Sequence, residues 1–457
     1  MKKYAAIFSA LALIPLFAFA KQDQTSKVFK SGDNVCLVGD SITHGGFYTE
    51  NIALFYITRF PDMELKFHNL GISGDSCGGI LARMEDDIKP IKADIYTLMI
   101  GMNDVGRGKF SDANRSKPDH MQKVLNTREN YSKRLGKIAS VLAQNSRRLI
   151  LFTPSIYDQT SEGETENLFG VNDELKVYGE IGREIAKKHN ALVVDMWGQM
   201  EAANAKLHQT DKKKSVISKD RVHPRDPGGY VMAAKFVEDL GEPKFVSRME
   251  IDAAKKSLAE SFNADVSGLK FDGGKISFTA LEAALPYPTT KEKDEYDKVI
   301  NFLPEYNREI LRIRNLEDGK YSLSIDGKKV GEYSAGELSD GINLAANKKT
   351  PQYAQAREVA KLCSQHRAQS SQYRGIRATE FFAKLRKHKT DEERIEAAKK
   401  IAAEGKIKNP YVFGLVKKYP ELKPRQKEME KEVLEIIKRA YAAAQPKPHA
   451  FEIAPLK

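Results

Sequence analysis

The sequence has few cysteines and, beyond its first twenty residues, no long apolar run. Three cysteines in 457 residues are too few for a disulfide framework. No apolar stretch after residue 20 approaches the roughly 18 residues that a membrane span needs, and the mean hydropathy is -0.50. Because 41% of the residues are hydrophobic, a sizeable core can form. The composition excludes a mini-protein, a fully disordered chain and a membrane-spanning mature protein, and it predicts a soluble one.

Patterns that bind metals or nucleotides are also missing from the sequence. Neither a phosphate-binding P-loop nor a dinucleotide fingerprint occurs. Most histidines are scattered without ligand spacing: His44, His68, His120, His189, His208, His366, His388 and His449. We therefore expect a protein that works without a metal or any other cofactor.

Residues 1–20 have the pattern of a cleaved secretory signal. Two lysines precede an apolar run over residues 5–19, which ends in the small-x-small site Ala18-Phe19-Ala20. A membrane anchor is the alternative, but the run is short for one. No cysteine directly follows the cleavage site, so a lipid anchor is not expected. The pattern predicts export to the periplasm or the extracellular space.

Export would place the cysteines in an oxidising compartment. A bridge between Cys36 and Cys77 is possible there if their elements are neighbours. Cys36, however, lies in an apolar strand pattern, where a buried free thiol is the commoner state. The sequence leaves the bridge open and favours the free thiol.

The net charge of +12 is concentrated in one part of the chain. Residues 351–457 hold 24 Lys+Arg and 13 Asp+Glu, a net +11, whereas residues 21–350 are close to neutral. In the basic segment lysines alternate with glutamates, as on an ordinary solvated helix. We expect packing helices with a basic outer face and no nucleic-acid partner, and a contact with anionic polysaccharide through residues 351–457 stays open.

Apolar runs alternate with helical patterns over the first 240 residues. The strand-like runs cover residues 35–38, 65–70, 95–100, 149–152 and 191–194. Amphipathic helical patterns separate these runs. The alternation predicts an α/β fold with a mainly parallel five-stranded sheet, whose ligand crevice lies at the carboxyl ends of the strands.

From about residue 250 the pattern changes to short strands and turns. Strand candidates at 269–271, 276–278, 310–313 and 321–325 are separated by signals such as Asp326-Gly327. Beyond residue 350 Ala, Lys, Glu, Gln and Arg recur at helical spacing. The predicted organisation is a signal peptide (1–20), a catalytic domain (30–242), a small β-rich accessory region (250–345) and a basic helical C-terminal segment (350–457).

The first predicted strand runs directly into Gly39-Asp40-Ser41. Ser41 would open a helix at the carboxyl end of this strand, where free N–H groups favour an oxyanion. This is a suitable place for a nucleophile. The tripeptide alone could equally be a turn with Ser or Asp as a helix cap.

Two further predicted strands end in loops that would face Ser41. One ends at Gly71, and the other is followed by Asn103 and Asp104. A glycine lets its backbone approach a reacting carbonyl closely, and an asparagine amide can donate a hydrogen bond. The N–H groups of Ser41 and Gly71 and the side chain of Asn103 are therefore candidate oxyanion donors, although such residues are often simple turn formers.

Asp220 and His223 lie three residues apart before the last predicted helix. On one loop the carboxylate can accept the Nδ1–H of the imidazole, so that Nε2 faces the nucleophile and takes its proton. A surface hydrogen bond would explain the pair as well. Taken alone, the spacing is a weak signal.

Together these stretches resemble the SGNH/GDSL hydrolase family of esterases and lipases. The matching motifs occur in order over roughly residues 30–242: Gly39-Asp40-Ser41, Gly71, Gly101-Met102-Asn103-Asp104 and Asp220-Arg221-Val222-His223-Pro224. The resemblance implies a flavodoxin-like three-layer fold and a Ser-His-Asp triad. It assigns Ser41 as nucleophile, His223 as general base and Asp220 as orienting carboxylate, with Gly71 and Asn103 completing the oxyanion hole and Asp40 and Asp104 supporting them.

A second serine competes for the role of nucleophile. Ser76 lies in Gly74-Asp75-Ser76-Cys77-Gly78, which fits the G-x-S-x-G elbow and also follows a strand. An α/β-hydrolase carries more strands before its elbow than the two predicted here. We therefore expect this stretch to form a turn into the next helix.

The combined pattern predicts a secreted serine esterase that forms an acyl-enzyme. Resemblance to exported bacterial carbohydrate esterases favours the removal of acetyl groups from glycans. A lipase or lysophospholipase is the alternative, and residues 105–120 and 156–170 are candidates for the walls that decide between them. Neither segment is conspicuously apolar, which disfavours a hydrophobic pocket for a long acyl chain. A third possibility is a protein that mainly binds anionic glycan or surface through its basic tail.

Overall fold

The computed structural model describes residues 25–456, so the predicted signal lies outside the described residues. Five parallel strands form a sheet in the order β2-β1-β3-β4-β5. They are β1 (Asn34–Gly39), β2 (Lys66–Gly71), β3 (Ile95–Met99), β4 (Arg148–Phe152) and β5 (Leu192–Val194). The predicted α/β fold with a five-stranded parallel sheet is confirmed.

Helices cover both faces of this sheet, because successive strand residues point to opposite sides. Val35 and Leu37 join one core with α2 (Phe47–Arg59), α7 (Met196–His208) and α8 (Asp226–Asp239). Cys36 and Val38 join the other core with α3 (Cys77–Ala82), α5 (His120–Gln144) and α6 (Val171–Lys188). Short helices α1 (Ser41–Gly45) and α4 (Asp112–Arg115) lie in the connecting segments. The result is a three-layer domain.

All three cysteines are buried free thiols, so the bridge between Cys36 and Cys77 does not form. Burial raises the pKa of the Cys77 thiol well above its usual value. The expectation of a buried thiol at Cys36 is confirmed.

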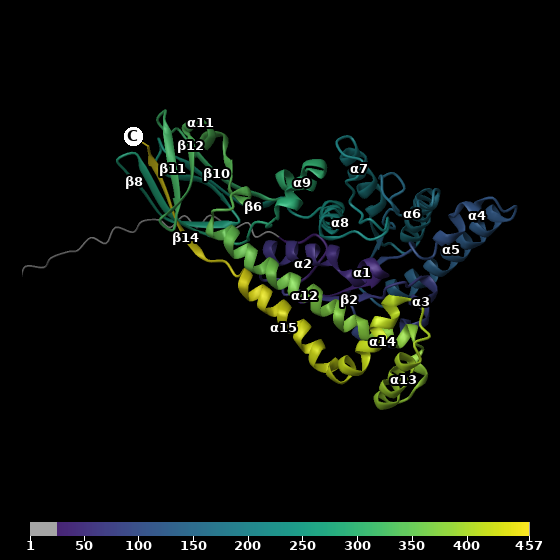
Figure 1. Cartoon of the computed structure of the whole chain (residues 1–457). Coiled ribbons are helices and arrows are strands. Elements are labelled where there is room, and N and C mark those ends of the chain that lie inside the picture. Colours follow the sequence, from purple (N-terminus) through teal and green to yellow (C-terminus); the bar gives the residue numbers. More distant parts are fainter. Residues whose placement is uncertain (1–24, 457) are drawn as a thin grey trace, which may run out of the picture.

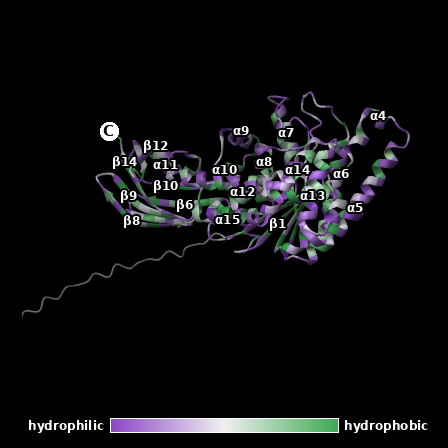
Figure 2. Cartoon of the chain, turned by 60° about the horizontal axis from the view of Figure 1, so that its bottom comes forward, coloured by the Kyte–Doolittle hydropathy of each residue, from purple (hydrophilic) through white to green (hydrophobic). Residues whose placement is uncertain are grey.

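The β-rich part is a sandwich of two sheets around a separate apolar core (Figure 1). One sheet has the order β13-β10-β6-β7 and the other β12-β11-β14-β9-β8. Their strands are β6 (Phe245–Asp252), β7 (Ser257–Phe262), β8 (Ala264–Asp272), β9 (Lys275–Glu282), β10 (Arg308–Arg314), β11 (Lys320–Ile325), β12 (Lys328–Ser334), β13 (Ile342–Asn343) and β14 (Pro448–Pro455). Helices α9 (Lys291–Ile300), α10 (Phe302–Tyr306) and α11 (Ala335–Asp340) connect them. Figure 2 shows apolar residues on these strands and on the central sheet.

The C-terminal segment joins the two parts. Helices α12 (Pro351–Phe382) and α15 (Gln426–Ala444) run side by side along the α/β domain, and α13 (Asp391–Glu404) and α14 (Pro410–Leu422) lie between them in the chain (Figure 1). Ala356 and Tyr441, from α12 and α15, are buried in the same core as α2. The chain then returns to the sandwich, where β14 pairs with β9 and β11.

This path changes the organisation that the sequence suggested. The segment predicted as helical, 350–457, ends in a strand, β14. This strand lies between β11 and β9, inside a sheet of the predicted accessory region 250–345. A strand whose partners are distant in sequence has no local turn signal to assign it to a sheet. Within residues 25–456 no helix is both long and apolar enough to cross a membrane.

Candidate active site

Ser41 opens α1 directly after β1, partly exposed at the carboxyl edge of the sheet. The buried side chain of Asp40 caps the helix by accepting the N–H of Ile42 at 3.0 Å. A Cβ on Gly39 would meet Oγ1 of Thr43 at 2.1 Å, so only glycine fits there. Burial raises the pKa of Asp40 to about 7, against the effect of the Ile42 hydrogen bond. The cap fixes the position of Ser41 without requiring a permanent charge beneath it.

The loop before α8 brings a histidine and an aspartate to Ser41. Nε2 of His223 lies 2.8 Å from Oγ of Ser41, and its Nδ1 lies 2.6 Å from Oδ2 of Asp220. Oδ1 of Asp220 accepts the backbone N–H of His223 at 2.9 Å and that of Val222 at 3.0 Å. The three side chains singled out in the sequence thus form one hydrogen-bonded chain.

The same contacts keep Asp220 ionised. Partial burial raises the pKa of this carboxyl, but the hydrogen bonds from the side chain and backbone of His223 outweigh it and hold the pKa well below its usual range. A carboxylate in this place can hold the imidazole in one tautomer and stabilise its protonated form.

Arg221 supports this loop and was not singled out from the sequence. Its φ of +63° is uncommon for a residue other than glycine, and it is 5% exposed. Its guanidinium donates to the carbonyl oxygens of Asp158, Ser161 and Thr165 at 2.9–3.0 Å. These bonds anchor the turn between Asp220 and His223. A single arginine in a loop gives no sequence signal of such a role.

The prediction that the N–H of Gly71 binds an oxyanion is wrong. This N–H already donates to Oδ1 of Asn69 at 2.9 Å, and the group is buried. A Cβ on Gly71 would lie 2.2 Å from the backbone nitrogen of His44. Glycine is therefore needed at this position for close packing of β2 against α1, and a substrate oxygen would have to compete with an existing hydrogen bond.

Gly74, three residues further on, has the properties expected at Gly71. It is exposed and has a φ of +79°. Its N–H has no hydrogen-bond partner among residues 25–456. The Nδ2 of Asn103 donates to the carbonyl oxygen of Asp75 at 2.8 Å, which ties the loop after β3 to the loop that carries Gly74. One N–H of the Asn103 amide is used in this way, and the other is available for a substrate.

Asp104 and Ser76 have structural roles in the same region. The carboxylate of Asp104 accepts the N–H of Cys77 at 2.9 Å at the start of α3, and burial raises its pKa to about 6. Oγ of Ser76 caps α3 by accepting the N–H of Gly79. Of the described residues, no histidine is hydrogen-bonded to Ser76. The expected turn into a helix is therefore present.

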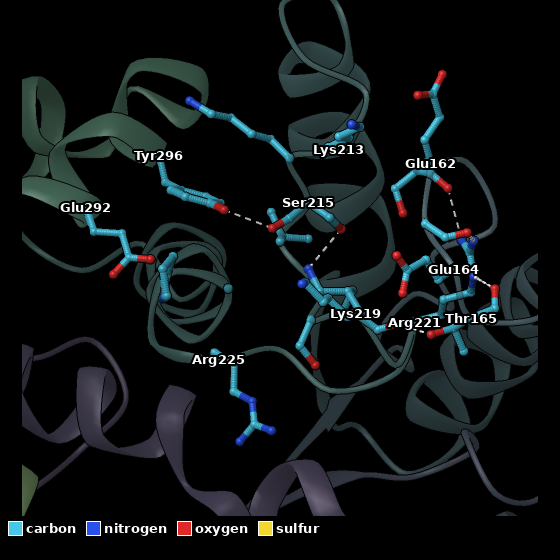
Figure 3. Close-up of a pocket in the computed structure, with 18 residues that line it drawn as sticks. Glu162, Glu164, Thr165, Lys213, Ser215, Lys219, Arg221, Arg225, Glu292 and Tyr296 are labelled. Carbon is cyan, nitrogen blue, oxygen red and sulfur yellow. Dashed lines mark hydrogen bonds between the residues drawn. The ribbon is translucent and has the colours of Figure 1, made fainter.

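A cavity of about 790 Å³ lies behind the loop that carries Asp220 and His223 (Figure 3). Residues 161–165, from a segment that the sequence suggested as a wall, line one side, and Tyr296 of α9 lines another. Charged residues of both signs contribute to the lining together with apolar ones such as Val216, Ile217 and Pro227; the charged residues are Glu162, Glu164, Glu292, Lys213, Lys214, Lys219, Arg221 and Arg225. Neither Ser41 nor His223 lines it.

Across residues 25–456 no group of three or more His, Cys, Asp or Glu side chains is arranged to hold a metal ion. The candidate site is instead a hydroxyl, an imidazole and a carboxylate in series. This set of groups can perform nucleophilic catalysis.

Known proteins with similar sequences and structures are esterases and related enzymes. Residues 37–229 match the GDSL-like lipase/acylhydrolase family. An acetylxylan esterase from Geobacillus stearothermophilus is 26% identical over 226 residues, which are 46% of this chain and 95% of that protein. A crystal structure of an acetylxylan esterase from the same organism is 25% identical over 47% of this chain and 97% of its own, with a TM-score of 0.38.

A third similar protein extends over nearly the whole chain. The structure of a gut microbial diltiazem-metabolizing enzyme is 29% identical, with a TM-score of 0.84 over 95% of this chain and all of its own. The α/β domain, the sandwich and the C-terminal helices therefore recur together in another enzyme. The matches and the fold identify this chain as a carboxylic ester hydrolase with a domain of the GDSL-like lipase/acylhydrolase family.

Proposed function

We propose that this ester hydrolase is a serine esterase whose nucleophile is Ser41, whose general base is His223 and whose orienting carboxylate is Asp220. The observation that carries the proposal is the 2.8 Å contact between Nε2 of His223 and Oγ of Ser41, with the 2.6 Å contact to Asp220 behind it. A hydroxyl attacks efficiently only when a base is placed to take its proton.

The proposed reaction has two halves. Oγ of Ser41 attacks the ester carbonyl carbon while Nε2 of His223 takes its proton, and His223 then protonates the leaving alcohol. The acyl group remains on Ser41. A water molecule next attacks the acyl carbon while His223 removes a proton from that water. His223 then passes the proton to Oγ of Ser41 as the carboxylic acid is released.

The negative charge of each tetrahedral intermediate needs hydrogen-bond donors. We assign this role to the N–H groups of Ser41 and Gly74 and to Nδ2 of Asn103. The two N–H groups make no hydrogen bond to residues 25–456, and Ser41 opens a helix, where the backbone favours negative charge. Such donors typically contribute about 10²- to 10³-fold each to the rate.

We further propose that the acyl group is acetyl and that the alcohol is a carbohydrate. A relative that matches residues of the α/β domain bears the name acetylxylan esterase. The cavity beside the catalytic loop carries charged side chains of both signs, which could bind hydroxyl groups of a sugar. Export to the periplasm or beyond, proposed from residues 1–20 alone, would bring the enzyme to such glycans.

Hydrolysis of p-nitrophenyl acetate and p-nitrophenyl decanoate by wild type, Ser41→Ala and Ser76→Ala tests the nucleophile and the acyl group together. We expect acetate to be cleaved much faster than decanoate, and activity to be lost in Ser41→Ala alone. Release of acetate from acetylated xylo-oligosaccharide then tests the carbohydrate. Preference for decanoate would indicate a lipase, and loss of activity in Ser76→Ala alone would overturn the site.

A further inference from the structure

The end of β2 and the loop after it, residues 71–76, carry the oxyanion donor Gly74 and are contacted by a distant part of the chain. Helix α12 passes beside α1 and β2 (Figure 1). Four residues of the C-terminal segment reach the loop or the side chain that holds it: Ser371, Arg374, Phe382 and Tyr411. This loop is thus held between the α/β domain and the C-terminal helices.

His44 of α1 links α12 to the loop. Its Nε2 donates to the carbonyl oxygen of Ser371 at 2.9 Å, which leaves Nδ1 without a proton. Nδ1 can therefore accept the N–H of Ser73, which lies 3.2 Å away. The ring is 4% exposed, and burial lowers its pKa to about 4. A neutral histidine with a single fixed tautomer bridges the helix and the loop.

Arg374 makes a second link from α12. Its Nε donates to the carbonyl oxygen of Gly71 at 3.3 Å, and its two terminal nitrogens bind Asp87 at 2.7 and 2.8 Å. The side chain is 2% exposed. A buried bidentate ion pair fixes the guanidinium, so the carbonyl of Gly71 is held by a rigid partner.

Two aromatic side chains of the C-terminal segment lie next to the loop. The ring of Phe382, at the end of α12, lies 3.2 Å from where a Cβ of Gly74 would be. The hydroxyl of Tyr411, in α14, lies near the side chain of Ser73, which offsets part of the rise that burial causes in the pKa of Tyr411, although the residue is 44% exposed. These contacts limit movement of the loop away from Ser41.

We propose that α12 positions the oxyanion loop, with His44 and Arg374 as the positioning residues. The inference rests on the proposed function, because it assigns a task to contacts of the same site. Asn103 donates to Asp75 within this loop, so a shift of the loop would displace the donors at Gly74 and Asn103 together. A misplacement of about 1 Å can reduce a rate by about 10²-fold. The C-terminal segment is then part of the catalytic unit.

Variants of His44 in the full chain test this proposal with p-nitrophenyl acetate. His44→Phe keeps an aromatic ring but removes the hydrogen bonds to Ser371 and to the backbone and hydroxyl of Ser73, and we expect kcat to fall by about 10- to 100-fold with KM within about twofold. His44→Asn places an amide oxygen near the former Nδ1 and should recover part of kcat. The longer side chain of His44→Gln reaches Ser371 instead and leaves the N–H of Ser73 unpaired. This variant should not recover kcat.

His366→Phe is the matched control, since His366 lies on α12, is 6% exposed and faces Phe67 of β2, away from the loop. It should lower the melting temperature as much as His44→Phe does and leave kcat unchanged. If His44→Phe does not fold, Tyr411→Phe, at an exposed position, provides a second test. We expect it to lower kcat less than the loss predicted for His44→Phe, with KM unchanged.

The results separate the two proposals. If Ser41→Ala stays active, the proposed function fails. If Ser41→Ala is inactive but His44→Phe retains kcat, or shows the same kcat as His366→Phe, the positioning role of α12 is overturned. If His44→Phe does not fold, full kcat in both Tyr411→Phe and His44→Asn overturns it as well.

Discussion

Replacing Asp220 by asparagine should abolish most of the activity while keeping the shape of the site. Oδ1 of Asp220 accepts hydrogen bonds from Ser218 at 2.9 Å and from two backbone N–H groups at 2.9 and 3.0 Å. Three donors at one position select the amide oxygen of an asparagine there. The amide nitrogen must then face Nδ1 of His223, where the carboxylate oxygen now lies at 2.6 Å.

This arrangement would reverse the tautomer of His223. Nδ1 would accept from the amide, so the ring proton would move to Nε2, which faces Oγ of Ser41 at 2.8 Å. The imidazole could no longer take the serine proton. We expect kcat to fall by roughly 10⁴-fold, a rise of roughly 5 kcal/mol in the barrier.

The assay is the rate of p-nitrophenyl acetate hydrolysis, with circular dichroism to confirm the fold. Asp326→Asn is a matched control, because Asp326 binds Nδ1 of His449 at 2.7 Å in the sandwich, remote from Ser41. It should retain the wild-type kcat. A loss below about tenfold in Asp220→Asn, or an equal loss in the control, would refute the reasoning.

Two further substitutions probe the loop and the sandwich. Gly74→Ala adds a Cβ at a φ of +79° and 3.2 Å from the ring of Phe382, so the loop should shift and kcat should fall by about tenfold or more. An unchanged kcat would contradict the expected displacement of the N–H at position 74. Burial, reinforced by the neighbouring carboxylate of Glu282, raises the pKa of Glu309 in the folded protein well above its usual value. The contribution of Glu309 to the free energy of unfolding is therefore fully present below pH 4.5 and is lost as the pH rises. Glu309→Gln should therefore melt at a higher temperature than wild type at pH 8, with the difference vanishing near pH 4, and an equal melting temperature at pH 8 would contradict the assignment.

Local sequence patterns were sufficient for the α/β sheet and for the geometry between Asp220 and His223. Alternating apolar runs indicate which residues are buried on which element, and a pair three residues apart can meet on one loop whatever else the chain does. The position of Ser41 also followed, because it directly succeeds a strand. These features depend on short stretches and on the shared edge of parallel strands.

The choice between Gly71 and Gly74 required the tertiary structure. Gly71 ends β2 and Gly74 lies in the loop that follows, and the sequence does not show that Asn69 already binds the N–H of Gly71. The charge pattern of the C-terminal segment likewise did not reveal its place. In the structure Lys438 pairs with Glu435 on the outer face of α15, as on a solvated helix, while contact with anionic polysaccharide stays a prediction.

The sequence by itself determined where the five strands lie along the chain, the serine after the first one and the histidine–aspartate loop, because each depends on residues close together in the chain. Only the tertiary structure decided which backbone N–H groups stay free, where β14 pairs and how α12 reaches the oxyanion loop. His44 and Ser371 are 327 positions apart, and such contacts depend on how whole elements pack. Packing selects one partner among many chemically equivalent groups, and no local pattern records that selection.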